Sequence, residues 1–295
     1  MQIPLTDSAK ADKTNVEPDD ITHHVASDIA YERLLIVNVA FVGVVGAGDG
    51  QWVLVDAGIP GMSDRIIEAA DKRFSSDSRP AAILLTHGHF DHVGSLEKLA
   101  EEWDVPIYAH TLELPYLNGK AAYPPPDPLV GGGMMSLLSP LYPRGPINVS
   151  DRLVPLPEDG SVPCLPGWQW FHTPGHTPGH VSFWRQSDRT LLAGDAFITT
   201  GQESAYAVAT QRPEMHGPPM YYTQNWSDAA QSVRQLAALD PELVVTGHGQ
   251  AMRGPTMRTA LNQLAQNFNT VAIPKGSEYV THPASSQDGS AYVLK

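Results

Sequence analysis

The amino-acid sequence predicts an α/β fold in which strands and helices alternate along one large domain. Short apolar runs rich in β-branched residues alternate with segments whose apolar residues recur at helical spacing, which is the pattern of α/β proteins. With 295 residues, of which 42% are hydrophobic, the chain is typical of soluble globular proteins and can bury a sizeable core. Polar side chains follow several predicted strands, where open α/β sheets place their ligand-binding residues.

Composition limits the classes of partner. The chain carries 19 basic and 32 acidic residues, and its net charge of −13 argues against nucleic-acid backbones and anionic membrane surfaces as main partners. The single cysteine, Cys164, excludes an internal disulfide. No His or Asp pairs with Cys164 in a recognisable motif, so we expect a buried or half-buried small side chain rather than a nucleophile.

The first thirty residues are polar. They contain no apolar core of signal-peptide length, and no segment elsewhere approaches the length of a membrane span. We therefore expect a cytoplasmic protein with a flexible N-terminal arm over residues 1–30 and a single domain over residues 31–295.

The domain begins with a predicted hairpin. Residues 34–45 are rich in β-branched and apolar residues, and a glycine-rich turn separates them from a strand at 51–56. Asp56 ends that strand, and two roles are open for it. It is either a turn or helix-entry residue, or the hydrogen-bond partner of a metal-bound imidazole, which commonly has a carboxylate on its other nitrogen.

Helices and strands continue to alternate after the hairpin. A helix is predicted over residues 62–74, with its apolar residues on one stripe and Ser63 as its N-cap. It leads to a buried strand at 81–85. A further helix over 93–100 and a strand at 105–109 follow.

The segment 86–92, Thr-His-Gly-His-Phe-Asp-His, connects the strand at 81–85 to the next helix. A helical conformation would point two of its histidines, His87 and His89, about 200° apart, so we expect an extended loop. In an extended loop His87, His89 and Asp91 lean to one side and His92 to the other. The segment can then supply ligands to two neighbouring metal ions.

Three further candidate ligands lie downstream, each at or just beyond the end of a predicted strand: His176, Asp195 and His248. Proline and glycine on both sides of His176 fix a rigid turn and remove side-chain bulk next to a ligand. A chance cluster or a solvated polar loop does not explain this full set. We therefore predict a dinuclear metal site.

The other histidines near these segments are poorer ligand candidates. We expect His110 to be a partly exposed polar residue, because it has no partner nearby. His172 and His180 are expected to support the ligands or to pack in the core. The remaining predicted elements are strands at 152–157, 168–172, 181–184, 191–195 and 243–246, and helices at 227–239 and 255–268.

Two irregular segments interrupt the alternation. Residues 112–150 combine proline and glycine clusters with apolar and aromatic side chains. We predict an ordered, lid-like insertion over the metal pocket that could double as a homodimer contact, and a plain surface insertion is the alternative. Residues 201–224 are expected beside the pocket mouth, with Tyr221, Tyr222 and His216 as candidate substrate contacts.

Taken in order, these ligands resemble those of the metallo-β-lactamase superfamily, over roughly residues 34 to 250. The resemblance implies a four-layer αββα sandwich with the site at one edge of its two sheets. It also implies the distribution of the ligands: His87, His89 and His176 on one ion, Asp91, His92 and His248 on the other, and Asp195 between them.

Imidazole and carboxylate ligands without thiolate suit two Zn²⁺ ions, with iron or manganese as alternatives. Two ions roughly 3.5–4 Å apart can hold a bridging hydroxide near neutral pH and polarise a carbonyl oxygen. The expected partner is thus a small-molecule ester, lactone or thioester, and the expected reaction is its hydrolysis, foremost that of a lactone. Asp91 would be the catalytic residue that orients the hydroxide and passes a proton to the leaving group.

Several alternatives are open within this resemblance. Asp195 is similar to its counterpart in the glyoxalase II and lactonase branches, whereas one antibiotic-hydrolysing class has cysteine there. N-acyl homoserine lactonases commonly place tyrosine three residues later, where this chain has Ile198. Thioester or β-lactam hydrolysis is therefore an alternative reaction. A mononuclear iron persulfide dioxygenase and a metal-stabilised binding protein are alternatives of other classes.

Overall fold

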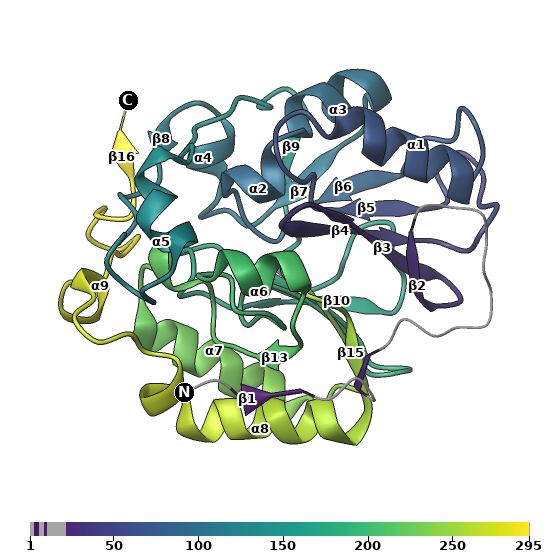
Figure 1. Cartoon of the computed structure of the whole chain (residues 1–295). Coiled ribbons are helices and arrows are strands. Elements are labelled where there is room, and N and C mark those ends of the chain that lie inside the picture. The colour runs from purple at the N-terminus through teal and green to yellow at the C-terminus, as the bar shows by residue number, and fades with distance from the viewer. Residues whose placement is uncertain (1–2, 6–8, 11–21, 295) are drawn as a thin grey trace.

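The structure of the chain, a computed structural model, describes residues 3–5, 9–10 and 22–294. Two mixed β-sheets pack face to face, and helices cover the outer face of each sheet (Figure 1). This is the predicted four-layer αββα arrangement.

The first sheet has seven strands, antiparallel from β2 to β5 and parallel from β5 to β9. In spatial order they are β2 (His23–Ala26), β3 (Ile29–Leu34), β4 (Val37–Val42), β5 (Val53–Val55), β6 (Ala82–Leu84), β7 (Ile107–Ala109) and β9 (Leu153–Pro155).

The second sheet has five strands, of which β12 and β14 are parallel neighbours. In spatial order they are β10 (Trp168–His172), β11 (Val181–Arg185), β12 (Thr190–Gly194), β14 (Leu243–Thr246) and β15 (Met252–Arg253). Two small sheets pair β1 (Ile3–Pro4) with β13 (Glu214–Met215), and β8 (Ala121–Ala122) with β16 (Val293–Leu294).

The layers follow from the two-residue period of the strands. In β5, Val53 and Val55 face the second sheet, whereas Leu54 packs outward with α1 (Ser63–Arg73) and α3 (Leu96–Trp103). In β14, Val245 faces the first sheet, and Val244 packs outward with α7 (Trp226–Ala238) and α8 (Gly254–Val271). Three apolar layers therefore hold the four layers of elements together.

The predicted hairpin is confirmed, with β4 antiparallel to β5. Its first strand begins later than predicted, because Leu35 adopts a positive φ of 61° in a turn and Leu34 belongs to β3. The predicted capping role of Ser63 is wrong. Met62 occupies the N-cap position of α1, and no side chain caps this helix end.

The structure differs from the expected N-terminal arm where residues of that arm are described. Residues 23–26 form the edge strand β2 of the first sheet, and Ile3–Pro4 pair with β13. The rest of the expected arm, residues 1–2, 6–8 and 11–21, lies outside the described residues. None of the helices in the described part of the chain combines the length and hydropathy that a membrane span requires.

The insertion over residues 112–150 contains regular elements that its composition did not predict. They are α4 (Leu114–Leu117), β8, α5 (Met134–Leu138) and the 3₁₀ turn η2 (Ser139–Leu141). The C-terminal segment packs along the insertion through β16 and α9 (Glu278–Thr281), beside α4, β8 and α5 in Figure 1. The Tyr279 hydroxyl, for example, donates to the Pro125 carbonyl at 2.5 Å.

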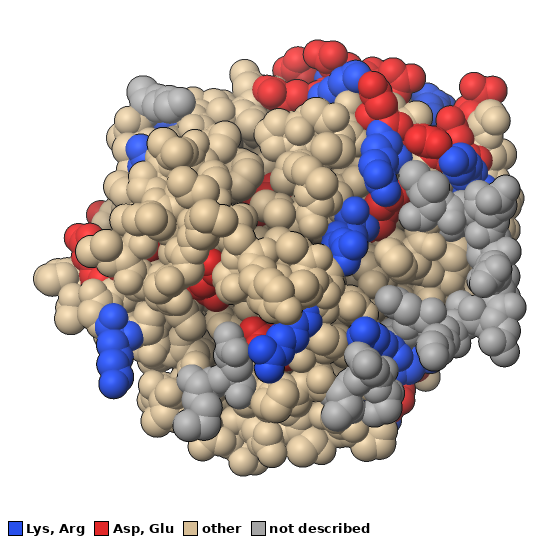
Figure 2. Space-filling model, viewed as in Figure 1, with Lys and Arg blue, Asp and Glu red and all other residues tan. Residues whose placement is uncertain are grey.

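The surface of the insertion is apolar. Leu129, Met134, Leu137 and Leu141 are all exposed. In the view of Figure 2, charged side chains gather over α1 and α3, whereas the face over α5 and α6 (Ala205–Thr210) is largely uncharged.

Cys164 is exposed, so the expected burial of this thiol is wrong. It lies in a loop with a positive φ of 64°, outside both sheets.

Candidate metal centre

The seven predicted ligands lie on four loops that meet at one edge of the two sheets. One loop follows β6, one joins β10 to β11, and the other two follow β12 and β14. All seven side chains are polar or charged, and all seven are buried. They are His87, His89, Asp91, His92, His176, Asp195 and His248.

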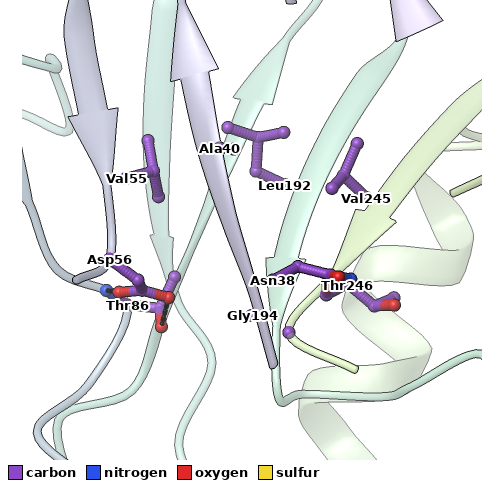
Figure 3. Close-up of a pocket in the computed structure, with 10 residues that line it drawn as sticks. Asn38, Ala40, Val55, Asp56, Thr86, Leu192, Gly194, Val245 and Thr246 are labelled. Carbon is purple, nitrogen blue, oxygen red and sulfur yellow. Dashed lines mark hydrogen bonds between the residues drawn. The ribbon is translucent and has the colours of Figure 1, made fainter. Parts of the chain in front are cut away.

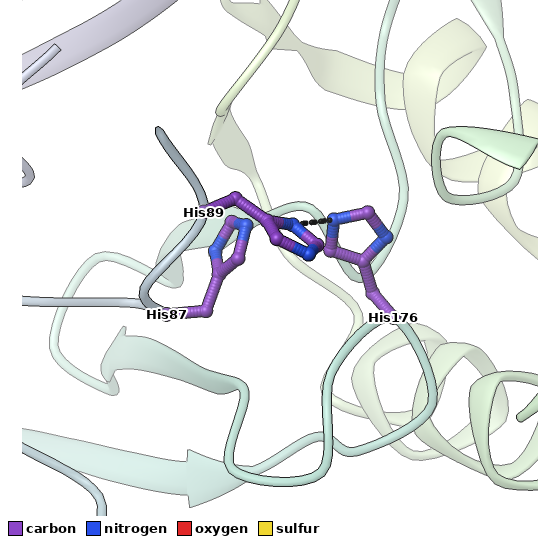
Figure 4. Close-up of side chains that lie close together, drawn as sticks. All are labelled: His87, His89 and His176. Carbon is purple, nitrogen blue, oxygen red and sulfur yellow. Dashed lines mark hydrogen bonds between the residues drawn. The ribbon is translucent and has the colours of Figure 1, made fainter. Parts of the chain in front are cut away.

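One group of ligands contains three histidines. His87, His89 and His176 each offer a ring nitrogen, and these atoms lie within 4.8 Å of one another. Nδ1 of His89 lies 2.9 Å from Nε2 of His176, the planes of the two rings are 85° apart, and His87 lies beside them (Figure 4). The extended backbone of His89, with φ −65° and ψ 153°, directs this side chain toward His176.

The second group contains Asp91, His92 and His248, whose ligand atoms also lie within 4.8 Å of one another. Asp195 lies between the two groups. Its Oδ2 is 3.1 Å from Nε2 of His248 and 3.5 Å from Nε2 of both His92 and His176. One carboxylate therefore reaches both groups, as a bridging ligand must.

The extended conformation predicted for the whole histidine segment holds only as far as His89. The backbone then turns into the short helix α2 (Phe90–Val93), in which the His92 and Val93 amides both donate to the His89 carbonyl. Asp91 and His92 project from this turn together. The predicted alternation of Asp91 and His92 to opposite sides of the loop is therefore wrong.

Four buried atoms of these ligands have no hydrogen-bond partner among the described residues. They are Nε2 of His87, His89 and His92, and Oδ1 of Asp195. Buried polar atoms are otherwise almost always paired, and leaving one unpaired costs about 1–3 kcal/mol. Clustered lone pairs from imidazole and carboxylate are the donors that divalent cations use, so these residues fit two metal ions.

The protonation states agree with this donor set. Burial, reinforced by neighbouring histidines, holds the pKa of His87 and His89 well below the ordinary histidine value. Burial also lowers the pKa of His176 to about 3. These three rings are therefore neutral at neutral pH, with lone pairs available for a cation.

The second group is arranged around carboxylates. Burial acts to raise the pKa of Asp195, but His248 and His92 outweigh it and hold the pKa of this carboxyl well below its usual range. Burial opposes the charged form of His92, yet Asp195 and Asp56 raise its pKa well above the ordinary value. A site that favours positive charge at this position also favours a metal cation.

Asp56 supports the ligands and also occupies a turn, so both roles left open by the sequence apply. Its φ is +63°, which places it in the left-handed region. Oδ2 accepts from Nδ1 of His92 at 2.8 Å and from the Thr86 hydroxyl at 2.8 Å, and Oδ1 accepts from the Thr86 amide at 2.8 Å. Asp56 thereby fixes the ring orientation of His92.

Two other ligands, His248 and His176, also contact a polar group outside the cluster through Nδ1. Nδ1 of His248 lies 2.5 Å from the Ile36 carbonyl, and Nδ1 of His176 lies 3.1 Å from the Thr223 hydroxyl. His180 accepts from the Asp195 amide through Nε2 at 2.9 Å, which confirms its expected supporting role. These contacts leave the opposite ring nitrogens of His248 and His176 to face the cluster.

A small cavity lies between the sheets, and Asp56, Thr86 and Gly194 line it (Figure 3). Opposite Asp56, Asn38 donates through Nδ2 to the Thr246 carbonyl at 2.9 Å and to the Gly249 carbonyl at 2.7 Å. Asn38 thus ties the first sheet to the loop that carries His248.

Aromatic side chains cover the cluster. The ring centroids of Tyr123 and Tyr222 lie 4.4 and 4.7 Å from that of His89. Of the two predicted tyrosines, Tyr222 therefore lies against a ligand, and Tyr221 packs behind it on Tyr222 with centroids 5.1 Å apart. His216 does not. Its Nε2 lies 3.6 Å from Glu203, and it lines a separate cleft with that residue.

Sequence reasoning missed Glu113 and Tyr123. Both belong to the insertion, and no motif marks them, because they contact ligand loops that are distant in sequence.

His110 is half-buried, as predicted, and stacks on His172 with centroids 4.3 Å apart. Among their described contacts, neither ring reaches the metal ligands; Nε2 of His172 lies 2.8 Å from the Pro178 carbonyl.

The sequence and the fold of this chain are similar to those of known proteins. The sequence model of the metallo-beta-lactamase superfamily matches residues 33–248. The probable metallo-hydrolase YflN of Bacillus subtilis is 46% identical over 236 residues, which cover 80% of this chain and 89% of YflN. The probable metallo-hydrolase YybB of the same species is 33% identical over 203 residues, 69% of this chain and 77% of YybB.

A beta-lactamase domain protein from Burkholderia ambifaria shares the fold. Its crystal structure matches with a TM-score of 0.61 at 20% identity, over 91% of this chain and 79% of that one. The predicted class, a metallo-hydrolase, is also the class named for the two Bacillus relatives. The chain belongs to the metallo-β-lactamase superfamily.

Proposed function

We propose that this protein is a dinuclear metal-dependent hydrolase of small carbonyl esters, foremost lactones. The observation that carries the proposal is the pair of buried ligand groups that share Asp195, with four buried polar atoms of these residues left unpaired. His87, His89 and His176 would hold one ion, and Asp91, His92 and His248 the other. Two Zn²⁺ ions suit these ligands, with iron or manganese as alternatives.

When bound, such ions supply a hydroxide near neutral pH and polarise the substrate carbonyl. The chain's own contribution to proton transfer is Asp91. Its carboxylate is buried, with Oδ2 3.5 Å from Nε2 of His248, and burial raises the pKa of this carboxyl. A carboxyl with a raised pKa can take a proton from water and return it to the leaving oxygen.

The aromatic side chains beside the ligands form the part of the site that would contact the substrate. The Tyr222 hydroxyl is buried and has no hydrogen-bond partner among the described residues, while its ring packs beside His89. We assign this hydroxyl the role of donor to an oxygen of the substrate. Phe90, Tyr142 and Tyr221 surround it with apolar surface, which suits a compact ester with an uncharged acyl group.

The second ligand group favours this proposal over a mononuclear iron dioxygenase. Asp91, His92 and His248 are as buried as the three histidines of the first group, and they have their own supporting contacts from Asp56 and Ile36. The second group therefore has the ligand types and the supporting contacts that a second ion requires.

The test combines metal analysis with a substrate screen on purified full-length protein. We expect two ions per chain and hydrolysis of lactones in preference to thioesters and β-lactams. Asp91→Asn should abolish turnover, whereas His110→Gln, which alters a half-buried histidine outside the ligand groups, should retain it. One iron per chain with O₂ consumption on a persulfide would refute the proposal in favour of the dioxygenase. Metal binding without turnover of any substrate class would favour a binding protein.

A further inference from the structure

Glu113 lies in the insertion, immediately before α4, and its side chain is fully buried. Its carboxylate accepts four hydrogen bonds. Oε1 accepts from the Thr177 hydroxyl and the Gly179 amide, both at 2.8 Å. Oε2 accepts from the Gly88 amide at 2.9 Å and from the Tyr123 hydroxyl.

Three of these four donors come from the two loops that carry the three-histidine group. Gly88 lies between His87 and His89, and Thr177 directly follows His176. Glu113 is thus a single group bonded to both loops, and it sets the distance between their backbones. The fourth donor, Tyr123, belongs to the insertion and also packs its ring on His89.

The glycines on the two loops are needed for this approach. A Cβ atom at Gly88 would lie 2.8 Å from the Tyr123 hydroxyl oxygen. A Cβ atom at Gly179 would lie 2.8 Å from Cγ of Glu113. Both distances are shorter than side-chain contacts allow, so the backbones reach the carboxylate only because these residues lack side chains.

The partners of Glu113 are two backbone amides and two hydroxyls. The amides can only donate, whereas the Thr177 and Tyr123 hydroxyls can donate to a carboxylate or accept from a protonated carboxyl. Burial raises the pKa of Glu113 above the ordinary glutamate value, and the hydrogen bonds from Tyr123, Thr177, Gly179 and Gly88 offset only part of this rise. When Glu113 is ionised, all four bonds are charge-assisted and therefore strong.

The insertion is itself held in place by the C-terminal segment. Tyr123 stacks on Tyr116, with ring centroids 3.6 Å apart and planes at 18°. The Tyr116 hydroxyl donates to the Ala291 carbonyl at 2.7 Å. Contacts therefore run from the C-terminal segment through two tyrosines to Glu113 and the ligand loops.

We propose that Glu113 is a positioning residue that holds the His87–His89 loop and the His176 loop at the separation required by the first metal ion. The inference rests on the proposed dinuclear site and extends it to a residue outside the ligand set. Glu113 touches neither ion nor substrate, so its effect is on the affinity of one metal position.

The experiment measures Zn²⁺ affinity at each position separately, by competition with a chromophoric chelator. His248→Ala disables the second group and leaves the first, and His176→Ala does the reverse. Adding Glu113→Gln should lower affinity about 10- to 100-fold in the His248→Ala protein and leave it nearly unchanged in the His176→Ala protein. The amide keeps the size of the side chain but places an NH₂ group against two donors.

Glu32→Gln is the matched control. Glu32 is also a buried glutamate, but it pairs with Arg65 on the outer helix α1. The Glu32→Gln substitution should reduce thermal stability without changing Zn²⁺ affinity at either position. Tyr123→Phe removes one of the four donors, so it should give a smaller loss at the first position even if Glu113→Gln fails to fold.

Amide hydrogen exchange of the metal-free protein separates this inference from the dinuclear site on which it rests. Glu113→Gln should accelerate exchange at Gly88 and Gly179, and Glu32→Gln should not. Equal loss of Zn²⁺ affinity at both positions, unchanged affinity at the first, or unchanged exchange would each overturn the role of Glu113. A parent protein that binds no Zn²⁺, iron or manganese would instead overturn the proposed function.

Discussion

Replacing Asp56 by asparagine should weaken the second metal position and destabilise the metal-free fold. Asp56 is 3% exposed and accepts three hydrogen bonds, two from Thr86 and one from His92. Asparagine is the right substitution because it tolerates the left-handed φ of +63° at this residue. The change therefore removes an acceptor without adding backbone strain.

The magnitude follows from the lost contacts. The NH₂ group of the asparagine amide would face a donor in place of one carboxylate oxygen, which leaves one or two buried donors unpaired at about 1–3 kcal/mol each. We expect the free energy of unfolding of the metal-free protein to fall by about 2–4 kcal/mol. Loss of the carboxylate on His92 should lower affinity for the second ion about 10- to 100-fold.

Urea unfolding of metal-free protein and Zn²⁺ competition in the His176→Ala background measure the two effects. Asp77→Asn is the control, because Asp77 also has a positive φ, 68°, but is exposed. Unchanged stability and unchanged Zn²⁺ affinity in Asp56→Asn would refute the reasoning.

Three further predictions concern the ligand cluster and its cover. Tyr222→Phe should reduce kcat/KM about tenfold, since one hydrogen bond to the substrate is lost, with metal content unchanged; loss of metal would contradict a substrate role. The metal-free protein should lose stability as the pH falls from 6.5 toward about 3. In this range His176 is protonated in the unfolded chain but neutral in the folded protein, where its pKa is about 3, so falling pH favours the unfolded state. Urea midpoints should decline less steeply over this range in His176→Gln, and an equal slope would count against this cause. Each metal ion, at one hundred times its Kd, should stabilise the fold by about 2.7 kcal/mol, so a chelator that leaves the Tm unchanged would argue against bound ions.

The metal ligands could be predicted because their chemistry is concentrated in short motifs at strand ends. His87 follows a short apolar run and His176 follows a run rich in aromatic residues, so a strand is predicted before each of them, and the resemblance to a known family implies that they meet at one sheet edge. Their backbone geometry was harder to predict. The turn at Asp91 and His92 depends on two amides that both donate to the His89 carbonyl, and the residue pattern does not predict these hydrogen bonds.

The supporting residues show the limit of local pattern. Asp56 was a candidate because it ends a strand, and one hydrogen bond to His92 gives it its role. Glu113 gave no signal, since its four partners come from distant segments that meet only in the folded chain. His216 is predicted as a substrate contact because its segment is expected beside the pocket mouth, yet its backbone pairs with Ile198 and its Nε2 lies 3.6 Å from Glu203.

Anomalous X-ray diffraction at the zinc edge, on crystals grown with Zn²⁺, tests the central claim most directly. Two adjacent peaks about 3.5–4 Å apart, one on each side of the Asp195 carboxylate, are the predicted result. A single peak, or zinc bound away from His87 and His248, would contradict the dinuclear site and the hydrolase proposed from it.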